Sequence, residues 1–256
     1  MDFNRVIGIG WDVSGWMGNN HGAAICEWKR ETNRISWLGS PAEVAIPENN
    51  LLSLKHFIQQ VDPSFNLSSL DEHTLVVIGV DAPLGFPAAF TELLIGGRPE
   101  MVKPKREIDN PLAYRYTDRE IHRVFGKKPL SAAYDRIGNN ATAAMLHTKR
   151  WQEEEYFQIY PFTDPNSADR RVIIEVYPAL LKEKKFKEVH EHLAEFFPSN
   201  VAPGTDAYDA CICALYAISF STNGLLLPKL QGPPEDHEEE VKEEGWIYYF
   251  ANETSK

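Results

Sequence analysis

Runs of apolar residues at the start of the chain predict three consecutive strands. Arg5 to Asp12 (RVIGIGWD) is a short apolar run that ends in an acid, and His21 to Trp28 follows it after a turn rich in Gly and Asn. Arg34 to Leu38 (RISWL) alternates between polar and apolar residues, as a half-buried strand does. The first part of the chain therefore predicts a β-meander.

Helical and extended patterns alternate through the rest of the chain. The apolar residues of 51–61 recur at helical spacing, and the β-branched run Thr74 to Val80 is typical of a strand buried on both faces. Asp81 to Pro87 is predicted as a loop, because a proline restricts the residue before it. The other predicted elements are helices around Thr117–Phe125, Asn140–Trp151, Leu180–Phe197 and 206–220, the last capped by Thr205, and strands Arg171–Val176 and Gly245–Phe250.

This order predicts an α/β fold in one domain spanning residues 1–256, with a helical insertion at about 88–170 and an acidic loop at about 232–244. The chain has no apolar run close to the roughly 18–20 residues that span a bilayer, so no membrane association is expected. Residues 1–10 lack a cationic region and a cleavage site, and three cysteines are an odd number. We therefore expect a cytoplasmic protein.

Charge is distributed unevenly along the chain. The formal net charge is −11, and the stretch Glu235 to Glu244 holds seven acids and one lysine. Arg98 to Lys128 carries nine bases and five acids. An overall acidic balance disfavours tight non-specific binding of nucleic acid, whose phosphates attract Lys and Arg. It still allows a phosphodiester substrate held by a few arginines.

Acidic residues lie at the ends of several predicted elements. Asp12 and Asp81 follow strands and Glu175 lies near the end of another, while Asp206 and Asp209 are spaced i, i+3 in the first turn of the last long helix. Clustered carboxylates raise one another's pKa, and Mg²⁺ or Mn²⁺ relieves the repulsion with the oxygen ligands it prefers. If these side chains converge, a site of one or two divalent metals is predicted.

Each acid also has a structural interpretation. Asp12 and Asp81 could form turns, and Asp206 and Asp209 could interact with the positive end of the helix dipole. Glu175 could form a salt bridge with a basic neighbour. The joint pattern over early, middle and late strands and the final helix favours the functional interpretation.

Three arginines recur every four residues on one predicted helix. Arg115, Arg119 and Arg123 could bind a substrate phosphate, since guanidinium groups hold phosphates through paired hydrogen bonds. Pairing with Asp118, Glu120 and other acids is the structural alternative.

Five motifs together resemble a known family. In chain order they are IGIGWDVSGW, GVDAPLGFP, RYTDREIHR, IIEVYP and TDAYDACICALYA. They resemble domain-of-unknown-function family 429, a predicted nuclease family, and the likeness runs from Val6 to Trp246. The acids are also similar to the Holliday-junction resolvase pattern, which has one aspartate on the first strand, an acid after the fourth and an Asp-x-x-Asp pair on the last helix. Gly10-Trp11-Asp12 departs from the small-residue turn that is usual at the first of these positions.

The resemblance implies a ribonuclease H-like three-layer fold with a mixed sheet of five to six strands. It also implies metal-dependent phosphodiester hydrolysis, in which Asp12, Asp81, Asp206 and Asp209 bind Mg²⁺ or Mn²⁺ and Glu175 supports catalysis. The substrate would be a nucleic acid or a small phosphodiester, and the protein could form a homodimer. The alternatives are an actin-like ATP-binding phosphotransferase on the same superfold and a catalytically inactive binding module of this fold.

Overall fold

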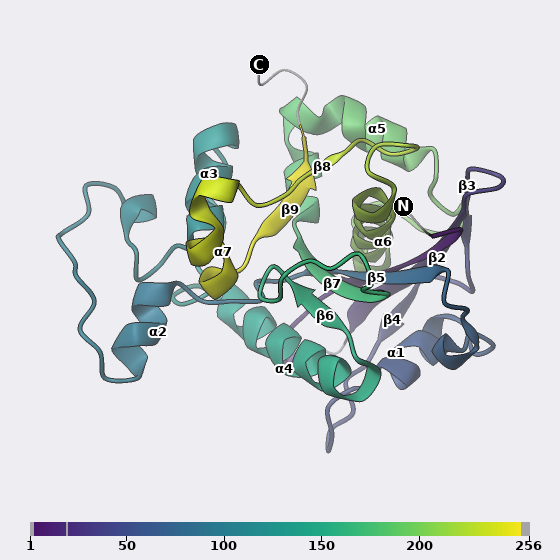
Figure 1. Ribbon diagram of the computed structural model, residues 1–256, viewed down its shortest axis with the longest axis horizontal. Helices are drawn as coiled ribbons and strands as arrows, with labels where there is room; N and C mark the ends of the chain where they lie inside the picture. Colours follow the sequence, from purple (N-terminus) through teal and green to yellow (C-terminus); the bar gives the residue numbers. More distant parts are fainter. Residues whose placement is uncertain (1–2, 19, 252–256) are drawn as a thin grey trace.

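A mixed β-sheet forms the centre of the protein, whose computed structural model describes residues 3–18 and 20–251 (Figure 1). Within these residues the sheet has nine strands in the order β3-β2-β1-β5-β7-β9-β8, with β4 beside β2 and β6 beside β7. The strands are β1 (Arg5–Asp12), β2 (His21–Lys29), β3 (Arg34–Trp37), β4 (Ala42–Val44), β5 (Thr74–Asp81), β6 (Gln158–Tyr160), β7 (Arg171–Val176), β8 (Leu230–Gln231) and β9 (Ile247–Phe250).

The directions of the strands divide the sheet into two parts. β1, β2 and β3 are antiparallel and form the predicted meander, whereas β1, β5, β7 and β9 run parallel. Parallel neighbours need crossover connections, which the helices supply. The carboxyl ends of the parallel strands therefore lie along one edge of the sheet, where loops can present polar side chains.

Helices cover both faces of the sheet (Figure 1). α6 packs on one face against β1, β2 and β5, and α1 and α4 contribute to the core on the other face. The helices are α1 (Leu54–Val61), α2 (Ala88–Leu94), α3 (Tyr116–Phe125), α4 (Ile137–Glu155), α5 (Lys187–Ala194), α6 (Asp206–Thr222) and α7 (Glu238–Glu244). No helix in the described part of the chain is long and apolar enough to cross a bilayer.

The prediction of an α/β fold is confirmed, and the predicted strands and most predicted helices lie within a few residues of their observed bounds. The sheet is larger than the expected five to six strands, because three short pairings, β4, β6 and β8, extend it. The 88–170 region contains α2, α3 and α4 as expected, but it also contributes β6, which pairs with β7.

Two predicted elements differ from the structure. The predicted helix 180–197 is divided into the 3-10 turns η3 (Pro178–Lys182) and η4 (Lys184–Phe186) followed by α5, because Leu180, Leu181 and Phe186 all bury their side chains. The predicted acidic loop contains the helix α7, in which Val241 and Glu244 are buried. Tertiary contacts thus determine both local structures.

Glycines allow α6 to approach the sheet closely. A Cβ atom on Gly10 of β1 would overlap the carbonyl oxygen of Ala210, and one on Gly22 of β2 would overlap that of Asp206. No larger residue fits at these two positions without a shift of the helix. The first turn of α6 is consequently held against the ends of β1 and β2.

Candidate functional site

Asp12 and Asp81 lie side by side at the carboxyl ends of two parallel strands. Asp12 of β1 is in register with Asp81 of β5. Side chains alternate between the two faces of a strand, and Trp11 and Val80 belong to the core beneath α1 and α4. The two aspartates therefore lie on the opposite face, which α6 covers.

The first turn of α6 brings two further acids to the same place. The Thr205 hydroxyl accepts a hydrogen bond from the backbone N–H of Tyr208 at 3.2 Å and caps the helix, as predicted. Asp206 and Asp209 follow in the first turn. A Cβ atom on Gly22 would lie 3.1 Å from the Cβ of Asp12 while overlapping the backbone of Asp206. Because both residues lie so close to Gly22, the start of α6 is adjacent to the end of β1.

The electrostatics of the aspartates show that they interact. Burial, and then the charges of Asp209 and Asp206, raise the pKa of Asp12 to about 7. Burial, followed by the charges of Asp12 and Asp209, also raises the pKa of Asp81 well above its usual range. In both aspartates the ionised form is therefore disfavoured, because the surrounding negative charge is poorly compensated. We call Asp12, Asp81, Asp206 and Asp209 the acidic cluster.

One lysine reaches the acidic cluster from η3. The Nζ of Lys182 lies 3.0 Å from Oδ2 of Asp209, and its charge opposes the rise in pKa of both Asp12 and Asp81. The other oxygen of Asp209, Oδ1, is buried and has no hydrogen-bond partner among the described residues. An unpartnered buried oxygen is costly unless a ligand satisfies it.

The residues of the acidic cluster have the chemistry that a divalent metal requires. Carboxylate oxygens are hard ligands suited to Mg²⁺ or Mn²⁺, and the unpartnered Oδ1 of Asp209 is such a donor. As the side chains stand in residues 3–18 and 20–251, no three His, Cys, Asp or Glu are arranged to surround a metal ion. Binding would therefore require some aspartate side chains to rotate toward the metal.

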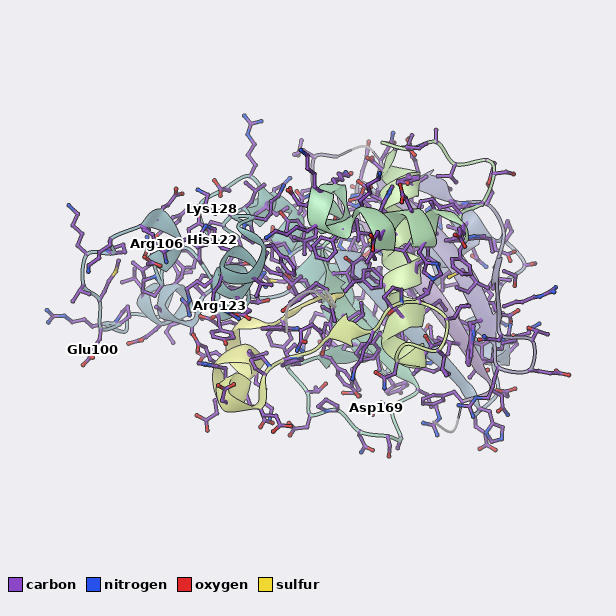
Figure 2. The ribbon with its side chains drawn as sticks, turned by 90° about the horizontal axis from the view of Figure 1, so that it is seen from above. Glu100, Arg106, His122, Arg123, Lys128 and Asp169 are labelled. Atoms are coloured by element: carbon purple, nitrogen blue, oxygen red, sulfur yellow. The ribbon has the colours of Figure 1, made fainter. Side chains whose placement is uncertain are left out.

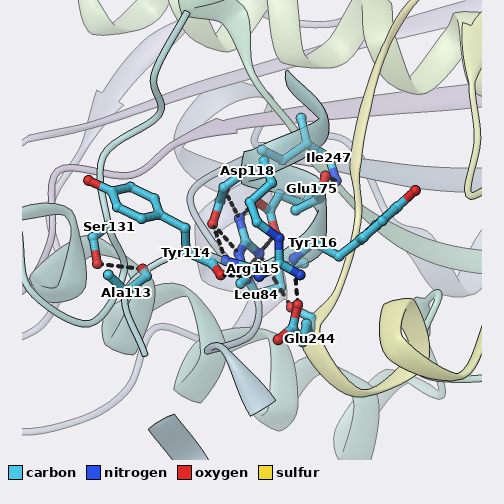
Figure 3. A network of polar contacts seen from close by, with 12 residues as sticks. Leu84, Ala113, Tyr114, Arg115, Tyr116, Asp118, Ser131, Glu175, Glu244 and Ile247 are labelled. Atoms are coloured by element: carbon cyan, nitrogen blue, oxygen red, sulfur yellow. Dashed lines mark hydrogen bonds and ion pairs between the residues drawn. The ribbon is translucent and has the colours of Figure 1, made fainter. Parts of the chain in front are cut away.

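Glu175 belongs to a different group of charges. It lies opposite Val80 in the register of β5 and β7, so its side chain leaves the sheet on the face away from α6. Arg115 holds it through two hydrogen bonds of 2.7 and 2.8 Å, and the N–H of Leu84 donates a third at 2.9 Å (Figure 3). The salt bridge considered as the structural alternative for Glu175 is thus present.

Arg115 is buried at the centre of this second group, which we call the Arg115 network. Its guanidinium also donates two 3.1 Å hydrogen bonds to Asp118 (Figure 3). Burial acts to lower the pKa of Arg115, but Asp118 and Glu175 together raise it above its ordinary range. Its side chain is only 1% exposed and two carboxylates already share its guanidinium, so a substrate phosphate would have to displace one of them.

The other two arginines of the predicted phosphate-binding row also have carboxylate partners. Arg119 of α3 donates to Glu240 of α7 at 2.6 Å, and Arg123 donates to Glu120 at 2.6 Å on the surface. All three arginines of this predicted row therefore form ion pairs with carboxylates of the same chain. Binding of a substrate by Arg119 or Arg123 would first have to break these pairs.

A small pocket lies where the acidic cluster and the Arg115 network meet. It encloses about 60 Å³ at the carboxyl ends of β5 and β7. Asp81 and Tyr177 line it together with Arg115, Glu175 and Leu130. Burial and the charge of Asp81 raise the pKa of Tyr177 to about 12, so its hydroxyl remains protonated at neutral pH.

Sequence reasoning missed Lys182 and the role of the glycines. Lys182 lies in the stretch PALLK, where no motif distinguishes it from the lysines that follow. The glycines of IGIGWD did carry a signal, because two glycines on the same face of a buried strand indicate close approach of a helix. That signal could have placed the start of α6 beside Asp12.

Comparison with known proteins identifies one family. The family described as "Protein of unknown function (DUF429)" matches residues 10–235. No curated protein matches the chain significantly, and no solved structure does. The matched region contains all four residues of the acidic cluster as well as Lys182.

Proposed function

The chain belongs to the DUF429 family, and from the geometry of its acidic cluster we propose that it is a metal-dependent phosphodiesterase that acts on nucleic acid. The observation that carries this proposal is the meeting of Asp12, Asp81, Asp206 and Asp209 on one face of the sheet, with the pKa of Asp12 raised to about 7. Such a concentration of partly buried carboxylates favours a site for a cation.

The four aspartates would hold Mg²⁺ or Mn²⁺, with Asp12 and Asp81 presented by rigid parallel strands and Asp206 and Asp209 by α6. A bound divalent ion would supply an activated water and stabilise negative charge on the leaving oxygen. The Arg115 network fixes the loop beside Asp81, because Glu175 accepts the N–H of Leu84. We therefore assign Glu175 a structural role in this mechanism.

A ribonuclease H-like fold is the second part of the proposal. The antiparallel meander β1–β3 followed by the parallel strands β5 and β7 is compatible with that fold. The positions of Asp12, of Asp81 after the fourth long strand and of the pair on α6 follow the acidic pattern expected from the sequence.

An extended basic segment supports an anionic polymer as substrate. Residues 95–106, which we call the arm, project from the body of the protein after α2 (Figure 1), and Glu100 lies near their outer end (Figure 2). Arg98, Lys103 and Lys105 are exposed and form no ion pair or hydrogen bond with the described part of the chain. Unpaired cations on a protein with net charge −11 match the phosphates of a nucleic acid.

The helix α2, which precedes the arm, contacts the segment that leads to the pocket beside Asp81. Phe90 of α2 packs edge-on against Tyr134, with ring centres 6.1 Å apart. Leu130, four residues before Tyr134, lines the pocket with Asp81. A strand of nucleic acid that contacts the arm could therefore extend toward the acidic cluster.

Cleavage of a panel of labelled DNA and RNA molecules in Mg²⁺ or Mn²⁺ tests the proposal. Asp12→Asn and Asp206→Asn each remove a metal-binding charge at nearly constant volume, and we expect the rate to fall by at least about a hundredfold. Asp236→Asn, which removes an exposed carboxylate of the turn Glu235–His237 outside the acidic cluster, is the matched control. Equal cleavage by wild type and both site variants would refute the mechanism.

A further inference from the structure

Lys182 is placed among the carboxylates by a well-anchored backbone. It ends η3, the turn that follows β7, and Leu180 and Leu181 immediately before it are 0% and 3% exposed. These two buried leucines fix the position of the turn against the core. The lysine side chain is itself 58% exposed, so its stem runs along the surface and its ammonium reaches inward to Asp209.

The contacts of Lys182 differ from those of an ordinary surface ion pair. Lys149, for example, lies 3.9 Å from the exposed Glu153 four residues along the same helix. Lys182 instead contacts an aspartate with a buried oxygen, 27 residues away, and its charge is also felt by Asp12 and Asp81. One ammonium thus contacts Asp209 directly and acts through its charge alone on Asp12 and Asp81.

We propose that Lys182 is a resident cation of the acidic cluster, which takes the place of a second divalent ion so that the site binds a single one. The inference rests on the proposed function. Four aspartates carry at most four negative charges, and one divalent ion with one ammonium offsets three of them. A second divalent ion beside the ammonium would be repelled at short range.

The same placement gives Lys182 a role toward the substrate. The Lys182 side chain is 58% exposed, so a phosphate could approach its ammonium from solvent. It can donate a charge-assisted hydrogen bond to a phosphate oxygen while it still neutralises Asp209. Lys182 is in this sense a positioning residue for both ligand and carboxylate.

Titration of the metal-free protein with Mn²⁺, followed by calorimetry and by the electron paramagnetic resonance signal of free Mn²⁺, tests the inference without any substrate. Wild type is expected to bind one ion. Lys182→Met, which keeps the stem and removes the charge, is expected to bind two ions or to bind the first at least about tenfold more tightly. Lys182→Arg should restore the wild-type behaviour.

Lys184→Met is the matched control, because Lys184 lies two residues further along and is exposed. It should bind Mn²⁺ as wild type does. If Lys182→Met and wild type bind the same number of ions with the same affinity, Lys182 forms a plain surface ion pair and only this inference fails. If wild type binds two ions, the inference fails while the metal site stands. If neither protein binds Mn²⁺, the proposed function fails together with it.

Discussion

Two groups of charged side chains meet at the carboxyl ends of the central strands, and they differ in how completely their charges are matched. In the Arg115 network one buried guanidinium is shared by Asp118 and Glu175, and all of these side chains are at most 3% exposed. In the acidic cluster four aspartates have one partly exposed lysine. The raised pKa of Asp12 reports this imbalance.

The difference separates a structural role from a functional one. A buried charge with all its hydrogen bonds satisfied stabilises a particular local structure and has no capacity left for a ligand. The Arg115 network accordingly joins the start of α3, the strand β7 and the loop at Leu84. In the acidic cluster the Oδ1 of Asp209 has no partner among the residues that the structure describes, and negative charge stays available for a cation.

Removing Arg115 gives the largest effect expected from this comparison. Arg115→Met leaves Asp118 and Glu175 as buried carboxylates without a counter-ion, and we expect the free energy of unfolding to fall by about 3–5 kcal/mol. Urea denaturation measures this loss. Arg123→Met is the control. It breaks the ion pair between Glu120 and Arg123, whose side chain is 71% exposed, and should change stability by less than about 1 kcal/mol. A loss below about 1 kcal/mol for Arg115→Met would contradict the structural role of the network.

The acidic cluster predicts a dependence of stability on pH in the metal-free protein. The carboxyl of Asp12 keeps its proton up to a pH of about 7 when folded, since its pKa is raised to that value, whereas the unfolded group ionises near 3.8. Between these values the folded state binds more protons than the unfolded state. Stability therefore falls as the pH rises from about 4 to about 7, by up to roughly 4 kcal/mol from this residue.

Asp12→Asn should remove this contribution, so the difference in unfolding free energy between variant and wild type should grow in favour of the variant over that range. His21 acts in the opposite direction, because burial lowers its pKa to about 4 and stability is lost as the pH falls below its usual 6.5. Both proteins share that contribution, and it cancels in the difference. If the difference in unfolding free energy is constant between pH 4 and 7, the pKa of Asp12 is not raised in the folded protein.

The comparison also shows what the sequence could predict. The positions of Asp12 and Asp81 follow from buried strands that end in an acid, and the cap at Thr205 places Asp206 and Asp209 in one helical turn. Local patterns of this kind depend on neighbouring residues only. Both the strands and the acids on them could therefore be predicted.

The partners of those residues depend on contacts distant in sequence. Glu175 lies in a strand whose residues are buried on both faces, so only the register with β5 shows which way it points. The acidic stretch is expected to be a loop because blocks of like charge are usually exposed loops. In the structure Glu240 pairs with Arg119, 121 residues away, and the backbone N–H groups of Ala88 and Tyr116 donate to Glu244. Lys182 reaches Asp209 in the same way.

The arm extends the comparison from acids to bases and gives the smallest effect on stability. The triple variant Arg98→Ala/Lys103→Ala/Lys105→Ala removes three exposed cations that have no partner in residues 3–18 and 20–251, so its unfolding free energy should stay within about 0.5 kcal/mol of wild type. Its affinity for labelled nucleic acid should fall, and the slope of log affinity against log salt should decrease in magnitude by about 2 for single strands. Fluorescence anisotropy with the Asp12→Asn background, which prevents cleavage, measures both quantities.

The control is the double variant Arg119→Ala/Arg123→Ala, which removes cations already paired with Glu240 and Glu120. Because a phosphate would have to displace those carboxylates, the salt slope of this variant should remain close to that of the background. A larger loss of affinity in the control than in the arm variant would show that the arginines of α3, and not the arm, bind the nucleic acid. It would also show that internal ion pairing does not distinguish structural from functional charge in this protein.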